Sequence, residues 1–492
     1  LGLAEIALRC GRLDQALASA MQAGATYSDT ATSLGGAEVN RLLGEVNLRR
    51  GMLAQAIALF DRSLRASRTL RAQVPYVRAM LGAAEANRRA GRPRKAEDLF
   101  TEARALTQEI EQPTLEAQAM LGQGQIARVR GLAGVAGPLL DEASRRFERL
   151  ERPAALAITL VERARVALSQ GRLDEAGRLI VQARRQAEAA ERTLGETSGA
   201  AQAACAGAAV AVALGRLDLA RAQAGEALRL AEDAGDEQAR VEATLAMAEV
   251  ELQADNLPAA VTAYNHAQSL ARTCESPVAE GLATVGMGRV LMRRGLWEEA
   301  ATTQQEALPR FRTAEDVNAQ ALALLGVGES RRNLADIPAA RQCFADAQRF
   351  FHDAGDPLGE AEALRGEARA LMDTPEIEAA VGRYAQALQL VERVGDAVQD
   401  ERDRASFFSD RALLYTEAIY ASAFERNANQ ALDLARSYSG RADTSGHAAA
   451  SQRLREYDDA LPTSGNDLTK QEIERNKAIA GILTDARKAI GK

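Results

Sequence analysis

Small and bulky side chains recur along this chain at spacings that belong to helices. A turn position, usually glycine, is followed five residues later by alanine, as in Gly51/Ala56 and Gly91/Ala96. Four residues beyond that alanine the side chain is often bulky, as at Phe60, and seven residues beyond it the side chain is small again. Offsets of four and seven lie on one face of an α-helix. Each unit is therefore predicted to hold two helices that pack closely through small residues.

The pattern occurs ten times, at intervals of 40 residues with a single interval of 44. A small element copied in register predicts a solenoid, in which each unit contacts its neighbours. The expected fold is all-α: a right-handed superhelical solenoid of about ten helix-turn-helix units over 1–393, followed by C-terminal helices outside the repeat. The ten turn positions are Gly11, Gly51, Gly91, Gly131, Gly171, Gly215, Asp255, Gly295, Ala335 and Pro375.

Two segments carry a resemblance to a known repeat. GMLAQAIALFDRSL (51–64) and GRPRKAEDLFTEA (91–103) resemble the tetratricopeptide repeat (TPR) in their alanine, aromatic and small positions. The common repeat has about 34 residues and a proline near the end of its second helix, whereas these units are longer and have no such proline. They look like a long-helix variant found in large regulatory and scaffold proteins. The resemblance implies a scaffold whose first helices line a concave groove that binds a protein or peptide.

The regular spacing is interrupted at 190–202, where four extra residues occur and where Gly195, Ser198 and Gly199 are found. Two interpretations stay open. The insertion is either a longer surface loop or a hinge between two rigid blocks, made of units one to five and units six to ten.

Beyond residue 393 the repeat register is lost. We expect connecting helices with a degenerate repeat around Ala431 at 394–440. For 441–492 we expect a polar linker and a terminal helix that lead to a further domain. Thr469 and Glu472 form a capping-box pattern at the start of that last helix.

This C-terminal region carries a second resemblance. The segments ALLYTEAIY (412–420) and QALDLARSYSGRA (430–442) look like the stretch between repeats and peptidase in CHAT proteins, which are bacterial caspase-like proteins with N-terminal TPR units. The resemblance implies that this chain is the regulatory array of such a protease. The family's catalytic His and Cys would lie in a separate α/β domain. The partners that it implies include an RNA-guided effector complex of a bacterial defence system.

Composition narrows the function classes. The chain has 492 residues, is 47% hydrophobic but only 4% aromatic, and carries a formal net charge of −7. The negative charge gives no case for direct DNA binding, and the absence of an apolar run of about 18 residues predicts no membrane span. The four cysteines are far apart, which favours free thiols in a reducing cytoplasm over disulfides or a metal site.

Candidate chemistry is scarce. Cys343 and His352 are nine residues apart, about 13.5 Å along a helix, which is too far for a catalytic dyad. The glycine-rich segments GQGQ (122–125), GMG (286–288) and GVG (326–328) fall on the small positions of first helices and are interpreted as packing positions. We therefore predict no catalytic, cofactor-binding or metal-binding residue, and no enzymatic activity for this segment.

Arginines shortly before the turn positions are the candidate partner-binding residues. In one interpretation they line the groove and bind carboxylates or RNA phosphates; in the other they form ion pairs within their own helices, with Glu45, Glu85 and Glu329. Trp297, the only tryptophan, is either a packing residue or a partner contact. The candidates are Arg49, Arg89, Arg128, Arg293, Arg332 and Trp297.

Three functions are compatible with these patterns. The first is the regulatory array of a CHAT-type protease, which the C-terminal resemblance favours. The second is a stand-alone scaffold that binds peptides. The third is the ligand-sensing arm of a signal-responsive ATPase or transcription regulator. A His…Cys peptidase after Lys492, a phosphate-binding loop before Leu1, or neither would distinguish them.

Overall fold

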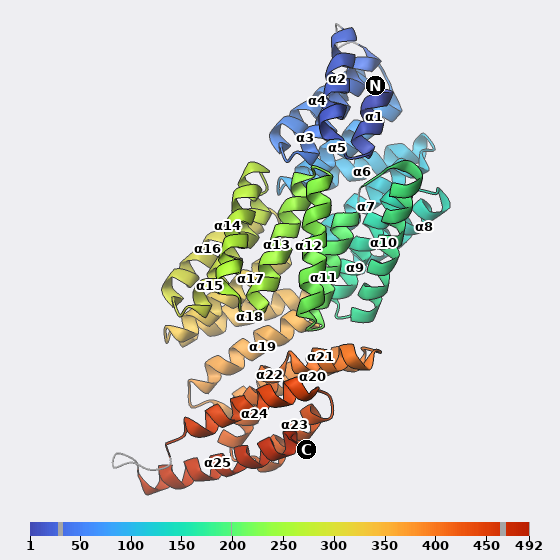
Figure 1. Cartoon of the computed structure of the whole chain (residues 1–492). Coiled ribbons are helices and arrows are strands. Elements are labelled where there is room, and N and C mark those ends of the chain that lie inside the picture. Colours follow the sequence, from blue (N-terminus) through green and yellow to red (C-terminus); the bar gives the residue numbers. More distant parts are fainter. Residues whose placement is uncertain (28–32, 198, 463–468, 492) are drawn as a thin grey trace.

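The computed structural model describes residues 1–27, 33–197, 199–462 and 469–491, and the regular structure within these ranges is helical. Ten helix pairs follow one another along the chain (Figure 1). The first helices of the units are α1 (Gly2–Arg9), α3 (Leu34–Arg49), α5 (Gln73–Arg89), α7 (Pro113–Val129), α9 (Pro153–Ser169), α11 (Ala200–Ala213), α13 (Glu237–Gln253), α15 (Pro277–Arg293), α17 (Val317–Asn333) and α19 (Pro357–Met372). The second helices are α2 (Leu13–Thr26), α4 (Leu53–Thr69), α6 (Pro93–Glu109), α8 (Ala133–Arg149), α10 (Leu173–Leu194), α12 (Leu217–Asp233), α14 (Leu257–Thr273), α16 (Trp297–Thr313), α18 (Ile337–Ala354) and α20 (Ile377–Asp396). The predicted all-α solenoid of helical hairpins is confirmed.

Bulky residues of one unit fill space left by glycines of the next. A Cβ atom built on Gly82 would lie 2.3 Å from the Phe60 ring, and one built on Gly122 would lie 2.3 Å from Phe100. The same relation joins Tyr264 to Gly286, at 2.1 Å. These contacts confirm that the glycines in GQGQ and GMG are packing positions. They also explain the low aromatic content, because the remaining small positions are alanines that let helices approach closely.

The solenoid winds far enough for its two halves to touch. A Cβ atom on Gly51 would lie 2.6 Å from the sulfur of Cys274, and one on Gly131 would lie 2.9 Å from the Ala354 methyl group. Two polar contacts between the same halves span 221 residues each: the Ala54 amide to Glu275 at 2.6 Å, and Arg94 to Glu315 at 2.6 Å. We call these contacts the seam. Its turn pairs are Gly11 with Ala234, Gly51 with Cys274, Gly91 with Ala314, Gly131 with Ala354, and Gly171 with Val394.

The seam explains part of the turn pattern. At Gly51 the backbone has φ of 77°, a left-handed conformation that glycine adopts without steric cost. The neighbouring half comes so close there that a side chain would collide with Cys274. In Figure 1 the upper ends of α12 and α14 lie against the blue turns of the first two units.

The insertion at 190–202 packs against the first unit. Gly195 ends α10 with φ of 67°, and Gly199 precedes α11 with φ of 93°. Glu196 between them is 9% exposed and lies 2.6 Å from Arg9. The loop is therefore docked on the array instead of lying free on its surface. Ser198 lies outside the described residues, and the hinge stays a prediction.

Five further helices form the C-terminal cap: α21 (Glu401–Ser409), α22 (Ala412–Phe424), α23 (Ala428–Ser439), α24 (Thr444–Asp459) and α25 (Lys470–Ile490). α22 and α23 pack as an eleventh hairpin, and Ala431 is fully buried in it. α24 lies in the stretch for which the sequence predicts a polar linker; residues 463–468 of that stretch are outside the described ranges. The capping box is confirmed, because Thr469 and Glu472 exchange hydrogen bonds of 2.8 and 3.2 Å.

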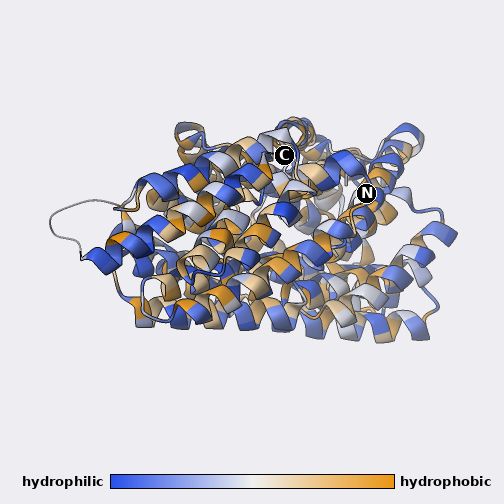
Figure 2. Cartoon of the chain, turned by 90° about the horizontal axis from the view of Figure 1, so that it is seen from below, coloured by the Kyte–Doolittle hydropathy of each residue, from blue (hydrophilic) through white to orange (hydrophobic). Residues whose placement is uncertain are grey.

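Many of the helices are amphipathic. Figure 2 shows hydrophilic and hydrophobic residues interspersed along the helices, as expected where one face packs and the other meets solvent. The helices α11 and α22 are instead apolar and buried over most of their length. None of the helices described is both long and apolar enough to cross a lipid bilayer.

Candidate functional site

The first helices of the units face one another on the inside of the superhelix. Arg165 of α9 reaches Glu242 of α13 at 3.0 Å, although a whole unit separates them in the chain. The residue at the equivalent position of that intervening unit is Ala209, whose short, exposed side chain leaves the path open. A direct contact between units five and seven is possible only if these helices line a common inner face.

Charged side chains cover this inner face. Glu162 accepts from Arg128 at 2.8 Å and from Arg165 at 3.0 Å, and Glu85 accepts from Arg88 at 2.8 Å. We call this set the inner cluster: Glu85, Arg88, Arg89, Arg128, Glu162, Arg165 and Glu242. Most of its side chains are partly exposed to solvent, at 24% for Arg88, 26% for Arg165 and 32% for Glu242.

Electrostatics keep Glu162 and Arg88 of the inner cluster charged. Burial alone would raise the pKa of Glu162, but Arg128, Arg165 and Arg88 lower it to about 2. Burial alone would likewise lower the pKa of Arg88, but the fields of Glu85, Glu162 and Glu242 raise it. Both Glu162 and Glu242 raise the pKa of Arg88, so carboxylates of units five and seven lie in the electrostatic environment of a guanidinium group of unit three.

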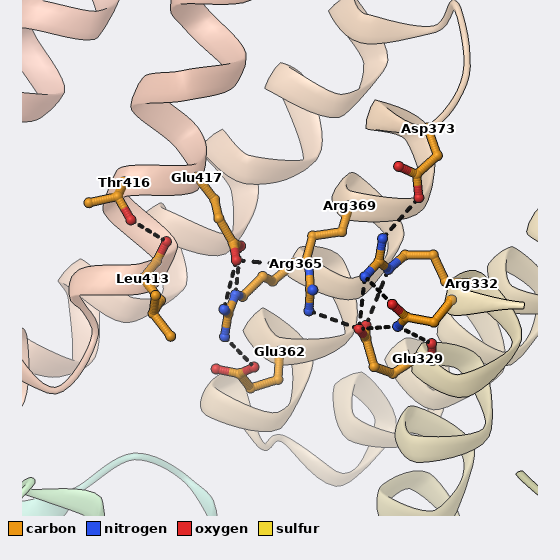
Figure 3. A network of polar contacts seen from close by, with 10 residues as sticks. Glu329, Arg332, Glu362, Arg365, Arg369, Asp373, Leu413, Thr416 and Glu417 are labelled. Carbon is orange, nitrogen blue, oxygen red and sulfur yellow. Dashed lines mark hydrogen bonds and ion pairs between the residues drawn. The ribbon is translucent and has the colours of Figure 1, made fainter. Parts of the chain in front are cut away.

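A second network lies near the cap (Figure 3). Arg365 of α19 makes a bidentate pair with Glu417 of α22, at 2.8 and 2.9 Å. Arg369 contacts Glu329 of α17 at 3.1 Å, and Arg332 bridges Glu329 to Asp373. Bidentate arginine–carboxylate pairs are directional and comparatively strong. The network therefore joins units nine and ten to the first hairpin of the cap.

The predicted arginines occupy different environments. Arg89 and Arg128 belong to the inner cluster, and Arg332 belongs to the network of Figure 3. Arg49 donates to the Leu8 carbonyl of the preceding unit at 2.9 Å, and Arg293 pairs with Asp255 at 3.2 Å. The structure thus brings Arg89 and Arg128 into one cluster, whereas Arg293 pairs at a turn.

The alternative interpretation, in which the arginines next to the turns pair with glutamates of their own helices, holds at two of the three glutamates. Glu85 pairs with Arg88 and Arg89, and Glu329 pairs with Arg332. Glu45 pairs instead with Arg41, which precedes it. Arg128 has its partner, Glu162, on the next unit's first helix. Local pairing therefore explains part of the pattern, and contacts between units explain the rest.

Several inner residues were not identified from the sequence, although a signal for them exists. The position directly after the small residue of each first helix is charged in most units and alternates in sign toward the C-terminus. Adjacent units pair there: Arg289 with Glu249 at 2.6 Å, and Arg369 with Glu329 at 3.1 Å. The full row is Glu5, Glu45, Glu85, Gln125, Arg165, Ala209, Glu249, Arg289, Glu329 and Arg369.

The remaining candidates have local explanations. Trp297 is the first residue of α16 and is half-buried, so its two interpretations stay open. His352 lies 3.3 Å from Glu360 on the next helix. All four cysteines are free thiols, and Cys205 and Cys274 are buried.

Comparison with known proteins finds one repeat family within the chain and several similar solved structures. The tetratricopeptide repeat family model matches residues 37–109, and no curated protein sequence matches the chain. Among solved structures, a Rap protein complexed with competence and sporulation factor aligns over 73% of this chain and 98% of its own, at 15% identity and a TM-score of 0.49. A signal transduction ATPase with numerous domains and a TPR sensor, from Pyrococcus horikoshii, aligns over 82% of this chain and 53% of its own, at 12% identity and a TM-score of 0.40. The chain is a TPR-like solenoid that carries a match to the TPR family in its second and third units.

Proposed function

We propose that this chain is a protein-interaction scaffold that binds a segment of a partner protein on its inner face. The observation that carries the proposal is the concentration of partly exposed arginine–glutamate pairs on the first helices, facing inward from successive units. Pairs of this exposure contribute only about 0–1 kcal/mol each. A partner that offers carboxylates or cations in the same geometry can therefore replace them at low cost.

We further propose that the array regulates a CHAT-type, caspase-like protease, with no catalytic role for residues of this chain. The resemblance of 412–420 and 430–442 to the segment before such a peptidase motivates this proposal. One contact supports it physically: the Arg365–Glu417 pair joins the inner face of unit ten to the cap. A partner that competes for Arg365 would loosen the cap, and with it any domain that the cap positions.

Charge reversal on the inner face tests the scaffold proposal. Arg365→Glu should abolish capture of the native partner, whether a protein or a ribonucleoprotein, from host extracts. Arg349→Glu is the matched control, because Arg349 is 64% exposed on the second helix α18 of the neighbouring unit. Equal capture by both variants and the unaltered chain would refute binding at this part of the inner face.

Peptidase activity tests the regulatory proposal. The captured partner should switch on cysteine-peptidase activity in the full-length gene product, and Arg365→Glu should uncouple that activity from the partner. A gene product that contains an ATPase in place of a peptidase would contradict protease regulation and favour the sensor-arm alternative. Neither domain would favour a stand-alone scaffold.

A further inference from the structure

The inner cluster is divided between the two halves of the superhelix. Arg88, Arg128 and Arg165 belong to units three to five, before the insertion at 190–202. Glu242 belongs to unit seven, after the insertion, and its Oε2 accepts from Arg165 Nη2 at 3.0 Å. One carboxylate of the second half is therefore inserted among the cations of the first.

The first half has an excess of positive charge at this place. Its part of the inner cluster holds four arginines and only two glutamates, Glu85 and Glu162. One arginine atom also lacks a partner: Arg89 Nη1 is buried, and no acceptor among the described residues hydrogen-bonds to it. The first half alone is thus a site for negative charge, which Glu242 fills only in part.

The seam joins the same two halves. Each of its turn pairs connects a turn of units one to five to the C-terminal end of a second helix in the second half, and the insertion is the covalent connection between the halves. Its polar contacts include Arg130 with Glu315 at 2.7 Å and the Gln399 amide with Asp174 at 2.8 Å. Separation of the halves would therefore break the seam and the Arg165–Glu242 pair together.

We propose that Glu242 occupies, from within the chain, the binding site of an acidic protein segment, and that this segment displaces Glu242 from Arg165 and thereby opens the seam. The proposal rests on the function proposed above and names the partner's chemistry: a stretch of Asp and Glu residues that pairs with Arg88, Arg89, Arg128 and Arg165. Opening would use the insertion at 190–202 as a hinge, which is the second of the two interpretations left open above.

Binding and opening are linked by thermodynamics. If the segment binds the arginines only when Glu242 has left them, it stabilises the open state by its differential affinity. In the reverse direction, any change that weakens the Glu242 contact increases the fraction of binding-competent molecules and raises the apparent affinity. This coupling between binding and opening requires the acidic segment to contact the inner face alone.

A poly-glutamate peptide is the probe, and its affinity for the whole chain is measured by fluorescence anisotropy. Glu242→Gln should tighten binding by at least about fivefold. Glu226→Gln is the matched control: it makes the same change of charge and also removes an arginine partner across units five and six, because Glu226 pairs with Arg184 at 2.6 Å on the second helices. Arg165→Gln should weaken binding by about tenfold or more.

Amide hydrogen exchange reads out the seam in the same samples. Saturating poly-glutamate should increase exchange in the turns around Gly51 and Cys274, and Glu242→Gln should increase it without peptide. Poly-lysine should do neither.

Each contrary outcome has a distinct meaning. If Arg165→Gln leaves poly-glutamate affinity unchanged, the inner cluster is not an acidic-segment site and the proposal is overturned. If Arg165→Gln weakens binding but Glu242→Gln equals Glu226→Gln, the internal competition by Glu242 is overturned while scaffold binding stands. If affinity follows the prediction but seam exchange is constant, the coupling to opening is overturned.

Discussion

The repeat array and the C-terminal cap both pack helices closely against one another, but they use different side chains at the contacts. In the array, bulky side chains fit against glycines of the same or the next unit, as Phe100 does against Gly122. In the cap, aromatic rings pack on one another: Phe407 and Phe408 lie 5.3 Å apart, and Tyr415 and Tyr438 lie 4.9 Å apart.

This difference predicts how far the destabilising effect of a substitution extends through the molecule. Array contacts are short-range and repeated, so loss of one should remain near its own unit. The aromatic rings of the cap connect α21, α22 and α23 through one fully buried cluster, and Tyr415 additionally donates its hydroxyl to Glu392 of α20 at 3.0 Å. Removal of one of these rings should therefore destabilise the whole cap and its junction with the array.

The largest expected effect is on the cap. Tyr415→Ala should cost about 3–5 kcal/mol of unfolding free energy, because it removes a fully buried ring. Hydrogen exchange should rise throughout α22–α25. Phe100→Ala, the array counterpart, should cost a similar amount but increase exchange only in units two to four. Equal spreading from both sites would invalidate the contrast.

A smaller effect is expected from overpacking the array. Ala300 is fully buried between helices, and Ala300→Leu should cost about 1–3 kcal/mol. Thermal denaturation of this variant and of Ala260→Leu measures the cost. Unchanged midpoints in both would show that these alanines do not lie at a close helix contact.

The next effect is a loss of stability in the array at acidic pH. In the array, Arg88 and Arg89 overcome the effect of burial and lower the pKa of Glu85 to about 2, from an ordinary value of 4.5. Because the folded-state pKa is depressed, Glu85 contributes its full stability above pH 4.5 and loses it as the pH falls toward 2. Exchange in α5 should rise over that interval, and Glu85→Gln should flatten the rise. Constant exchange in α5 between pH 4.5 and 2, or an equal rise in Glu85→Gln, would contradict this prediction.

The smallest effect separates seam contacts from turn strain. Gly51 and Gly295 occupy the same repeat position with φ of 77° and 75°, but only Gly51 faces the other half; nothing lies within 4 Å of a Cβ atom on Gly295. Both alanine variants should lose about 1 kcal/mol to left-handed strain. Gly51→Ala should lose more, by the cost of its contact with Cys274. Identical denaturation midpoints would argue against a tight seam.

The sequence predicts the array better than the rest of the molecule for a physical reason. Helix spacing and close packing are local, so the small and bulky positions around residues such as Ala56 and Phe60 determine the hairpins. The charged row that includes Arg165 and Glu249 also recurs in register, so the sequence contains it, but none of the candidate arginines next to the turns belongs to this row.

The seam and the cap could not be read in the same way. Whether Gly51 meets Cys274 depends on the small rotation between successive units, which accumulates over more than two hundred residues and has no local signature. In the cap, Tyr415 and Tyr438 come together from segments without a repeat register. The sequence of α24 is polar and only a few of its residues, such as Ala450 and Leu454, are buried, so the apolar pattern does not predict this helix.

The central claim is that the two halves of the superhelix touch along the seam, and a disulfide tests it most directly. A Cβ atom on Gly51 lies 2.7 Å from the Cβ of the native Cys274, and the pair Gly131 and Ala354 has a Cβ separation of 2.9 Å. Disulfides need a Cβ separation of about 3.8 Å, so a shift on the order of 1 Å suffices. Under mild oxidation, Gly51→Cys and the double variant Gly131→Cys/Ala354→Cys should each form the intramolecular disulfide in the monomer, identified by peptide mass spectrometry. Free thiols, or only intermolecular disulfides, in both variants would show that the halves do not touch and would contradict the account.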